Sequence, residues 1–336
     1  MARMRDVTQE TTVPCDNFYG EKDRTRRVAP REERAIFTQI LVPLDGSDLA
    51  EWALPVAERL ARATGATIHV IRVSEPPPPA LVWAGATGGM MSGGYLPGPV
   101  AAGDDLFAAE NRAASAYLDA VRERVSASGV SVRATHVTGD IASALLDYER
   151  DAAIDLVVVC SHGRSGLARF ALGSIAERLL HYGAVPVLLV RAFGAPVDLA
   201  HAVVPLDGSA LAEQALPVLG HLARAVVRAF TLVRVVGAGE DGPEAERYLE
   251  GVAHDLQRQG VFQGGDGVCQ RRVEQGDPAR AILDVAGADK LVVMATHGRA
   301  GLTRWAMGSV ADRVTRGGAG GVLLVRGTET GESSHA

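Results

Sequence analysis

The chain has 336 residues, more than one compact α/β domain usually needs and enough for two. Hydrophobic residues make up 47% and aromatic residues only 5%, so the interior must consist mainly of Ala, Val, Leu and Ile, as in helices packed on buried parallel strands. The formal net charge of −6 excludes a general polyanion-binding surface, and we expect no nucleic-acid partner.

Both ends of the chain are predicted to be flexible: residues 1–35 form a polar, charged arm and residues 328–336 a tail. There is no apolar signal-peptide core and no window of 18 apolar residues, so we expect no membrane partner. Cys15, Cys160 and Cys269 contain no CxxC pair and fit neither a disulfide framework nor a zinc site, which favours a cytoplasmic location.

The rest of the chain is an internal duplication. The segment from Ile40 to Val73 matches the segment from Ala202 to Val235, over a length far greater than a solenoid repeat. We therefore expect two domains, residues 36–193 and 199–327. The first contains a Pro/Gly-rich insert, residues 74–105, for which the second has only residues 236–243. Such a long loop is either disordered or a lid or partner-binding segment.

Strands and helices alternate along each copy. In the first copy the apolar patterns predict strands at 39–44, 67–73, 130–139, 155–162 and 185–191, and helices at 47–63, 107–126, 141–151 and 174–181. Strict alternation implies a parallel sheet with helices on both faces. Pro55 and its repeat Pro217 fall within an apolar helical stripe that continues beyond them, which predicts a kink in each first helix.

In such a sheet ligands lie at the carboxyl ends of the strands, where the strand order reverses. Several residues of each copy are predicted to meet there. After the first, second and third strands they are Asp45 and Asp207, Val73 and Val235, and Gly139 and Gly276. After the fourth strand comes "SHGRSGLARFALGS", residues 161–174, repeated as "THGRAGLTRWAMGS", residues 296–309.

This repeated motif has the features of an anion-binding loop. Glycines between a buried strand and a helix start expose backbone N–H groups, and Arg164 and Arg299 add positive charge. It is not a P-loop, because GxxxxGK[ST] is absent, and no GxGxxG follows the first strand.

A catalytic interpretation of the motif has less support. Cys160, Ser161 and His162 are adjacent, but neighbours on an extended segment point to opposite sides, and Cys160 becomes Ala295 in the second copy. His162 and His297 recur without other ligands at metal spacing, so we predict neither catalytic residues nor a metal site.

Asp45 and Asp207, each in "VPLDGS", allow two interpretations. An Asp-Gly-Ser sequence commonly ends a strand and caps the next helix. A carboxylate at the crevice can also accept hydrogen bonds from ribose hydroxyls or an adenine amino group. The second interpretation gains weight because both copies couple the aspartate to the glycine loop.

In combination, "VPLDGS…ALPVAERLA", the glycine after the third strand and "SHGRSGLARFALGSIAERLL" before "VPVLLVR" resemble the universal stress protein family in a tandem, two-domain form. The resemblance implies an α/β fold of two Rossmann-like (adenine nucleotide alpha-hydrolase-like) domains, each a five-stranded parallel sheet of order 3-2-1-4-5. It further implies ATP, with or without Mg²⁺, bound through a G-x2-G-x9-G-[S/T] pattern. The last strands of the two domains would pair antiparallel as a pseudo-dimer, and a homodimer of chains is an open alternative.

The resemblance also implies which residues bind nucleotide. In the first domain these are Pro43, Leu44, Asp45, Val73, Gly139, Cys160, His162, Gly163, Arg164, Gly173, Ser174 and Ile175. In the second domain they are Pro205, Leu206, Asp207, Val235, Gly276, Ala295, His297, Gly298, Arg299, Gly308, Ser309 and Val310.

The first glycine of the pattern is replaced in both copies, by Cys160 and by Ala295. Each replacement adds a Cβ where the backbone would approach the nucleotide, so we expect unequal sites. The function implied is a cytoplasmic, ATP-binding stress-response regulator that acts on an unknown protein partner, with at most slow hydrolysis. The alternatives are a scaffold that binds no nucleotide and an enzyme that consumes adenine nucleotides.

Overall fold

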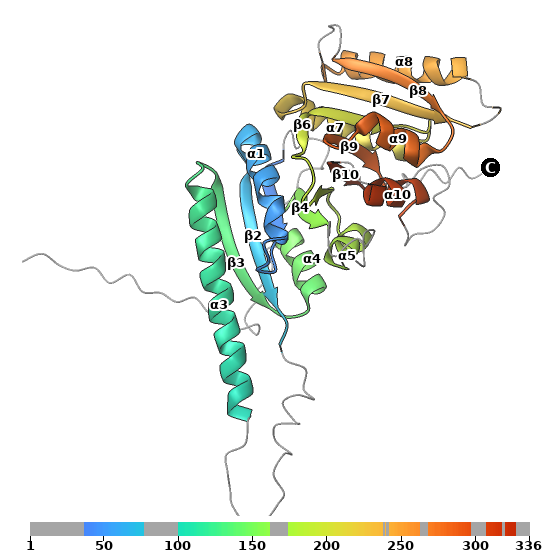
Figure 1. Cartoon of the computed structure of the whole chain (residues 1–336). Helices are drawn as coiled ribbons and strands as arrows, with labels where there is room; N and C mark the ends of the chain where they lie inside the picture. Colours follow the sequence, from blue (N-terminus) through green and yellow to red (C-terminus); the bar gives the residue numbers. More distant parts are fainter. Residues whose placement is uncertain are drawn as a thin grey trace, which may run out of the picture. The chain divides into compact units, whose positions relative to one another are not determined.

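A computed structural model describes residues 37–76, 100–161, 174–237, 239, 242–262, 268–296, 307–317 and 320–326, without the side chains of 100–105 and 174 (Figure 1). The predicted N-terminal arm, the C-terminal tail and residues 77–99 of the insert lie outside these ranges. So do His162, Gly163, Arg164 and Gly173 of the first motif and His297, Gly298 and Arg299 of the second.

Each half contains five strands with helices between them. The first half comprises β1 (Gln39–Pro43), the 3-10 helix η3 (Ala50–Ala53), α1 (Leu54–Thr64), β2 (Thr67–Ser74), α3 (Val100–Ser126), β3 (Ser131–Thr138), α4 (Ile141–Asp151), β4 (Leu156–Ser161), α5 (Ser174–Tyr182) and β5 (Val187–Arg191). The second half comprises β6 (Asp198–Pro205), α6 (Ala210–Glu213), α7 (Ala215–Ala225), β7 (Ala229–Val236), α8 (Gly242–Arg258), β8 (Cys269–Gln275), α9 (Pro278–Ala286), β9 (Lys290–Ala295), α10 (Ser309–Gly317) and β10 (Gly321–Val325).

The strands form one ten-stranded sheet in the order β3-β2-β1-β4-β5-β10-β9-β6-β7-β8. Within each half all neighbouring strands are parallel. A mostly parallel sheet with flanking helices confirms the predicted α/β class. In each half the first strand of the half is central, and the chain adds strands first on one side of it and then on the other. The strand order therefore reverses between β1 and β4 and between β6 and β9, which is where such sheets bind ligands.

The halves meet where β5 pairs antiparallel with β10, with Leu188 opposite Leu323. Side chains reinforce this seam from both ends. Arg326 donates from Nη1 to the Gly183 carbonyl at 2.8 Å, and Arg59 donates from Nη1 to the Val197 carbonyl at 2.6 Å. The antiparallel pairing that the family resemblance implies is therefore present within the chain.

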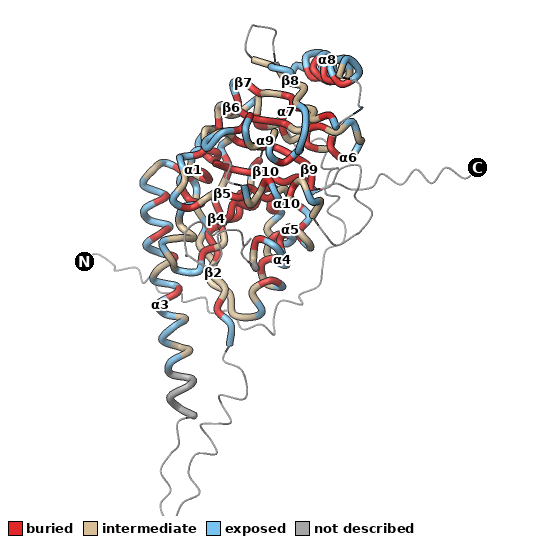
Figure 2. The backbone as a smooth tube through the Cα atoms, turned by 45° about the vertical axis from the view of Figure 1, so that its right-hand side comes forward, coloured by how far each residue is buried: buried red, intermediate tan, exposed pale blue. Residues whose placement is uncertain are grey.

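The central strands of the sheet are buried on both faces, whereas the edge strands β3 and β8 are partly exposed (Figure 2). Alternate residues of each strand point to opposite faces, so Ile40 joins one core and Leu41 the other. Buried residues of α1, α3, α7 and α8 pack on the first face, and those of α4, α5, α9 and α10 on the second. Corresponding helices of the two halves thus lie on the same face of the sheet, and each face carries a hydrophobic core that extends over both halves.

The predicted kinks at the prolines are wrong. Pro55 lies in the first turn of α1, after η3, and Pro217 lies in the first turn of α7, after α6. A proline in a first turn removes no helical hydrogen bond, because those N–H groups have no carbonyl partner within the helix. The predicted single helix is therefore two short elements in each half, and the prolines start the longer one.

The insert is shorter than the predicted residues 74–105. Ser74 is the last residue of β2, and α3 begins at Val100, seven residues before the predicted helix start. Among the helices that the structure describes, none is long and apolar enough to cross a bilayer.

Candidate functional site

The first strand of each half ends in the same hydrogen-bonded turn. Oδ1 of Asp45 accepts from the Ser47 backbone N–H at 2.9 Å and from the Ser47 hydroxyl at 2.6 Å. The Ser47 hydroxyl oxygen in turn accepts from the Ala50 N–H at 3.2 Å. Between them Gly46 has φ +88°, a conformation that favours glycine.

Asp207, Gly208 and Ser209 repeat this geometry in the second half. Oδ1 of Asp207 accepts from the Ser209 N–H at 3.0 Å and from its hydroxyl at 2.6 Å, and Ser209 caps α6 through the Ala212 N–H at 3.1 Å. Both aspartates therefore follow a strand end and hold the serine whose hydroxyl accepts from the start of the next helix. The turn occupies only Oδ1 of Asp45; no hydrogen bond from the described residues reaches Oδ2 of Asp45.

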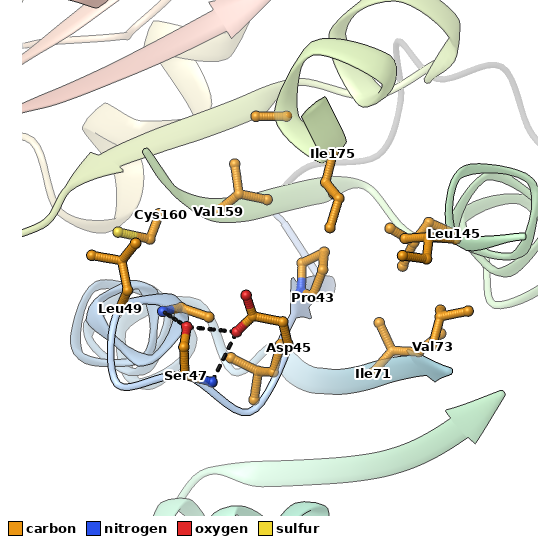
Figure 3. Close-up of a pocket in the computed structure, with 14 residues that line it drawn as sticks. Pro43, Asp45, Ser47, Leu49, Ile71, Val73, Leu145, Val159, Cys160 and Ile175 are labelled. Atoms are coloured by element: carbon orange, nitrogen blue, oxygen red, sulfur yellow. Dashed lines mark hydrogen bonds between the residues drawn. The ribbon is translucent and has the colours of Figure 1, made fainter. Parts of the chain in front are cut away.

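A pocket of about 280 Å³ lies beside the Asp45 turn (Figure 3). Six of its lining residues are among the predicted nucleotide-binding residues: Pro43, Leu44, Asp45, Val73, Cys160 and Ile175. Eight were not predicted: Ser47, Leu49, Ala50, Ile71, Ile141, Leu145, Val159 and Ala176. Most of the missed residues are aliphatic, and an aliphatic residue carries no chemical signal in a sequence, because it looks like any other core residue.

The pocket has a polar corner and aliphatic walls. Figure 3 shows Leu49 with Cys160 on one side and Ile71, Val73 and Leu145 on the other, with the Asp45 carboxylate between them. Ile71 and Val73 come from β2 and Leu145 from α4. The backbone ties these walls together, because the Leu44 N–H donates to the Ile71 carbonyl at 2.8 Å. An aliphatic slot ending in a carboxylate suits a flat apolar ring that carries hydroxyl groups.

Cys160 is a weak nucleophile in this setting. Burial raises the pKa of its thiol to about 11, and the charge of Asp45 acts in the same direction, so the thiol stays protonated at neutral pH. Ser161 points elsewhere, since its hydroxyl lies 3.3 Å from the Val190 carbonyl of β5. The geometry of these two residues gives covalent catalysis no support.

The glycines after the third strands are turn residues. Gly139 has φ +156° and donates its N–H to Ser74 at 3.0 Å; Gly276 has φ +108° and donates to Val236 at 3.2 Å. Each precedes an aspartate that caps a helix, Asp140 on α4 and Asp277 on α9. Gly139 is not among the residues that line the pocket.

The ends of the second glycine motif meet each other. The Gly308 N–H donates to the Thr296 carbonyl at 2.8 Å, and the Thr296 N–H donates to the Val325 carbonyl of β10 at 2.8 Å. Ser309 and Val310 then begin α10. In the first half Ser174 begins α5, and Ile175 and Ala176 bring its first turn to the pocket.

The remaining predicted residues of the second half occupy equivalent places. Pro205 ends β6 and is followed by Leu206 and Asp207, Val235 lies in β7, and Ala295 ends β9, buried. No group of three or more His, Cys, Asp or Glu side chains among the described residues is arranged to hold a metal ion.

Comparisons with known proteins agree with this architecture. A family model described as the universal stress protein family matches residues 37–88, 92–191 and 199–326. The universal stress protein YxiE of Bacillus subtilis is 28% identical over 156 residues, 46% of this chain and 100% of that protein. A universal stress protein of Mycolicibacterium smegmatis is 31% identical over 210 residues, 59% of this chain and 70% of that protein.

Among solved structures, the crystal structure of a universal stress protein from Archaeoglobus fulgidus is similar with a TM-score of 0.62 at 17% identity. The similarity covers 88% of this chain and 100% of that one. A putative universal stress protein from Pseudomonas aeruginosa has a TM-score of 0.57 at 17% identity, over 87% of this chain and 94% of that one. At this identity the likeness shows the fold.

Proposed function

Since the chain belongs to the universal stress protein family, we propose that it binds an adenine nucleotide, ATP with or without Mg²⁺, in the first-half pocket and acts as a cytoplasmic stress-response regulator. The observation that carries this proposal is the Asp45 carboxylate at the polar corner of an aliphatic pocket, with one oxygen engaged by its own turn. The regulator would pass the state of its bound nucleotide to a protein partner.

The pocket fits the nucleoside part of the ligand. Its volume of about 280 Å³ is at the lower end of small-ligand pockets, which hold a few hundred Å³. The adenine ring would lie between the aliphatic walls, against Val73 and Leu145, and burial of its faces would supply most of the affinity. Oδ2 of Asp45 would accept a hydrogen bond from a ribose hydroxyl, and Ser47 holds the carboxylate in place through Oδ1.

The phosphates would extend from this pocket to the glycine motif. We assign them to backbone N–H groups around Gly163, Gly173 and Ser174, with Arg164 supplying charge, and any Mg²⁺ would accompany the phosphates. The start of α5 supports the assignment, because Ile175 lines the pocket and the N-terminus of a helix favours an anion. His162 is assigned a place beside the phosphates, and Gly139 one at the rim.

The second half is a separate candidate site with the same assignments. Asp207 would meet the ribose and Val235 the adenine, and Gly298, Arg299, Gly308 and Ser309 would hold the phosphates. Ala295 is smaller than Cys160 at the position nearest the ligand, so we expect the two affinities to differ.

Isothermal titration with ATP tests the proposal. Wild type should bind in the micromolar range, and Gly173→Val or Asp45→Ala should weaken the first site, whereas Asp207→Ala should leave the first site intact. A second readout is the thermal unfolding midpoint, which a ligand that binds only the folded chain should raise. An absence of both heat and a raised midpoint in wild type refutes nucleotide binding.

The alternative function is a stress scaffold that works through protein partners without nucleotide. The observation that favours it is the Cys160 side chain in the pocket, where the family pattern has glycine. Mass spectrometry of small molecules released by denaturing the purified protein separates the two: stoichiometric ATP supports the first function, and none supports the scaffold. Any hydrolysis should be slow, and phosphate release at more than a few turnovers per hour would instead favour an enzyme.

A further inference from the structure

Arg72 lies directly behind the Asp45 turn, on the other side of β2 from the pocket. Ile71 and Val73 face the pocket, so the side chain of Arg72, between them in the strand, points to the opposite face. There its guanidinium abuts the turn: a Cβ added to Gly46 would lie 2.7 Å from Nη1 of Arg72 and 3.2 Å from its Cζ. The glycine therefore provides both the positive φ and the space that Arg72 occupies.

The guanidinium is supported by an aromatic ring. Cζ of Arg72 lies 5.8 Å from the centroid of the Tyr117 ring on α3, within the range of a cation–π contact. Burial raises the pKa of Tyr117, and so do the nearby carboxylates of Glu51 and Asp45. Tyr117 is therefore close to the same aspartate whose turn Arg72 contacts.

The second half contains the same arginine–tyrosine pair. Cζ of Arg234 lies 5.2 Å from the ring centroid of Tyr248 on α8, and the charge of Asp207 contributes to a raised pKa of Tyr248, whose first cause is burial. Arg72 and Arg234 occupy the same position, one residue before the valine proposed to meet adenine. Much of the sequence differs between the halves, yet both have an arginine guanidinium stacked on a tyrosine ring near the aspartate of the turn.

We propose that Arg72 is the positioning residue of the first nucleotide site: held by the Tyr117 ring, its guanidinium supports Gly46 and so fixes the direction of the Asp45 carboxylate. Its effect on ligand affinity rests on the proposed nucleotide function; its effect on the turn does not. A ligand-binding side chain needs neighbouring residues that hold it in one position, because a carboxylate displaced by about an ångström loses its hydrogen bond to the ligand.

The test compares Arg72→Ala and Arg72→Lys with Arg234→Ala, the matched change in the other half. Amide hydrogen exchange reports on the free protein, because the Ser47 and Ala50 N–H groups are bonded within the turn. Arg72→Ala should speed their exchange about tenfold while leaving the Ser209 and Ala212 amides unchanged, and Arg72→Lys should restore part of the protection. Unchanged exchange at Ser47 in Arg72→Ala overturns the proposal whether or not ATP binds.

Titration with ATP then tests the link to affinity. Arg72→Ala should raise the Kd of the first site about tenfold, a loss of about 1.4 kcal/mol, and Arg72→Lys should lie between it and wild type. If Arg72→Ala speeds exchange of the turn amides but leaves the Kd for ATP unchanged, Arg72 does not position Asp45 for the ligand. No ATP binding by wild type would refute the proposed function, with the exchange result still deciding the role of Arg72 in the turn.

A double-mutant cycle isolates the contact. Gly46→Ala brings a Cβ against Nη1 of Arg72, and this repulsion disappears in an Arg72→Ala background. Gly46→Ala should therefore accelerate Ser47 exchange less in that background than in wild type. Additive effects would contradict a direct action of Arg72 on Gly46.

Discussion

The hydroxyl of Tyr248 donates a hydrogen bond of 2.8 Å to Oε1 of Glu213, whereas the hydroxyl of Tyr117, its counterpart, is buried close to Glu51 without a hydrogen bond of comparable geometry among the described residues. The reason lies in a third residue. Glu51, the counterpart of Glu213, is engaged by Arg124, whose Nη2 lies 2.5 Å from Oε2. The second half has Asp255 at the position of Arg124, so its glutamate is left to the tyrosine.

This difference predicts unequal responses to the same change. Tyr248→Phe removes a hydrogen bond to a carboxylate and should lower the free energy of unfolding by about 1 to 2 kcal/mol. Tyr117→Phe removes a buried hydroxyl whose contact with Glu51 is weaker, and should cost less than Tyr248→Phe does. Urea unfolding of both variants checks this, and equal losses would contradict the contrast between the two tyrosines.

Arg124 provides the control for that comparison. Arg124→Asp copies the second half and releases Glu51, so Tyr117 should gain the bond that Tyr248 already has. In this background Tyr117→Phe should become more destabilising, by about 1 kcal/mol. A Tyr117→Phe effect that is the same with and without Arg124 would show that Arg124 does not determine the partner of Glu51.

The stability of the first half should depend on pH through His69, which is 1% exposed. Its Nε2 donates to Oε1 of Gln39 at 2.6 Å, and its Nδ1 accepts from the Tyr148 hydroxyl at 2.9 Å, an arrangement of the neutral ring. Burial, with the charge of Arg133, lowers the pKa of His69 from 6.5 to about 4.

In the unfolded chain His69 is therefore protonated below about pH 6.5, whereas in the folded chain it stays neutral down to about pH 4. The stabilisation is complete above pH 6.5 and is lost as the pH falls toward 4, a change on the order of 3 kcal/mol. Urea unfolding between pH 7.5 and 4.5 should show this loss in wild type and a smaller one in His69→Asn. The exposed His254 supplies the control: His254→Asn should keep the wild-type slope.

Two glycines should respond to alanine in opposite directions. Gly220 lies inside α7, and an added Cβ would meet only Val261 Cγ2 at 3.4 Å, so Gly220→Ala should stabilise the helix by about 0.5 to 1 kcal/mol. At Gly320, beside the β5–β10 seam, a Cβ would lie 2.7 Å from the Asp289 carbonyl oxygen, a backbone atom. Gly320→Ala should therefore lower the thermal unfolding midpoint, and a rise would contradict the close approach there.

The helices on the second face are coupled unequally in the two halves. Arg313 of α10 donates two bonds to the carboxylate of Asp277, at 2.6 and 2.8 Å, whereas Arg178 of α5 lies 3.9 Å from Asp140. The Arg313 bonds, followed by that from the Arg280 N–H, lower the pKa of Asp277. Arg313→Gln should speed amide exchange in the first turn of α9 more than Arg178→Gln does in α4. Equal responses would show that the two-bond geometry adds nothing.

The repeat and the alternating apolar segments were sufficient to predict the α/β class, and "VPLDGS" was sufficient to place Asp45 at a strand end. The helix prediction failed at Pro55 because the apolar stripe runs through two short elements, and a stripe does not show where one helix stops and the next begins. α3 was predicted too short because residues 100–106, "VAAGDDL", are mostly small and include a glycine, so they resemble the Pro/Gly-rich loop before them.

The pocket could be predicted only in part, for a physical reason. Motif residues such as Asp45 and Cys160 stand out by chemistry and by their repetition. Ile141 and Leu145 reach the pocket because α4 packs on the sheet beside β2, a tertiary relationship that the periodicity of a helix does not contain. The pairing of Arg72 with Tyr117 depends likewise on how α3 returns to β2 after the insert.

The β5–β10 seam makes the association of the two domains independent of protein concentration. Two separate chains joined at such an edge would dissociate on dilution and would exchange subunits. Here a linker of a few residues between Arg191 and Asp198 keeps the effective concentration of one half near the other high. The linker also frees the protein from symmetry. In a homodimer a single codon alters both crevices at once, but here Cys160 and Ala295, or Arg124 and Asp255, can change one at a time, so one crevice can be tuned without altering the other.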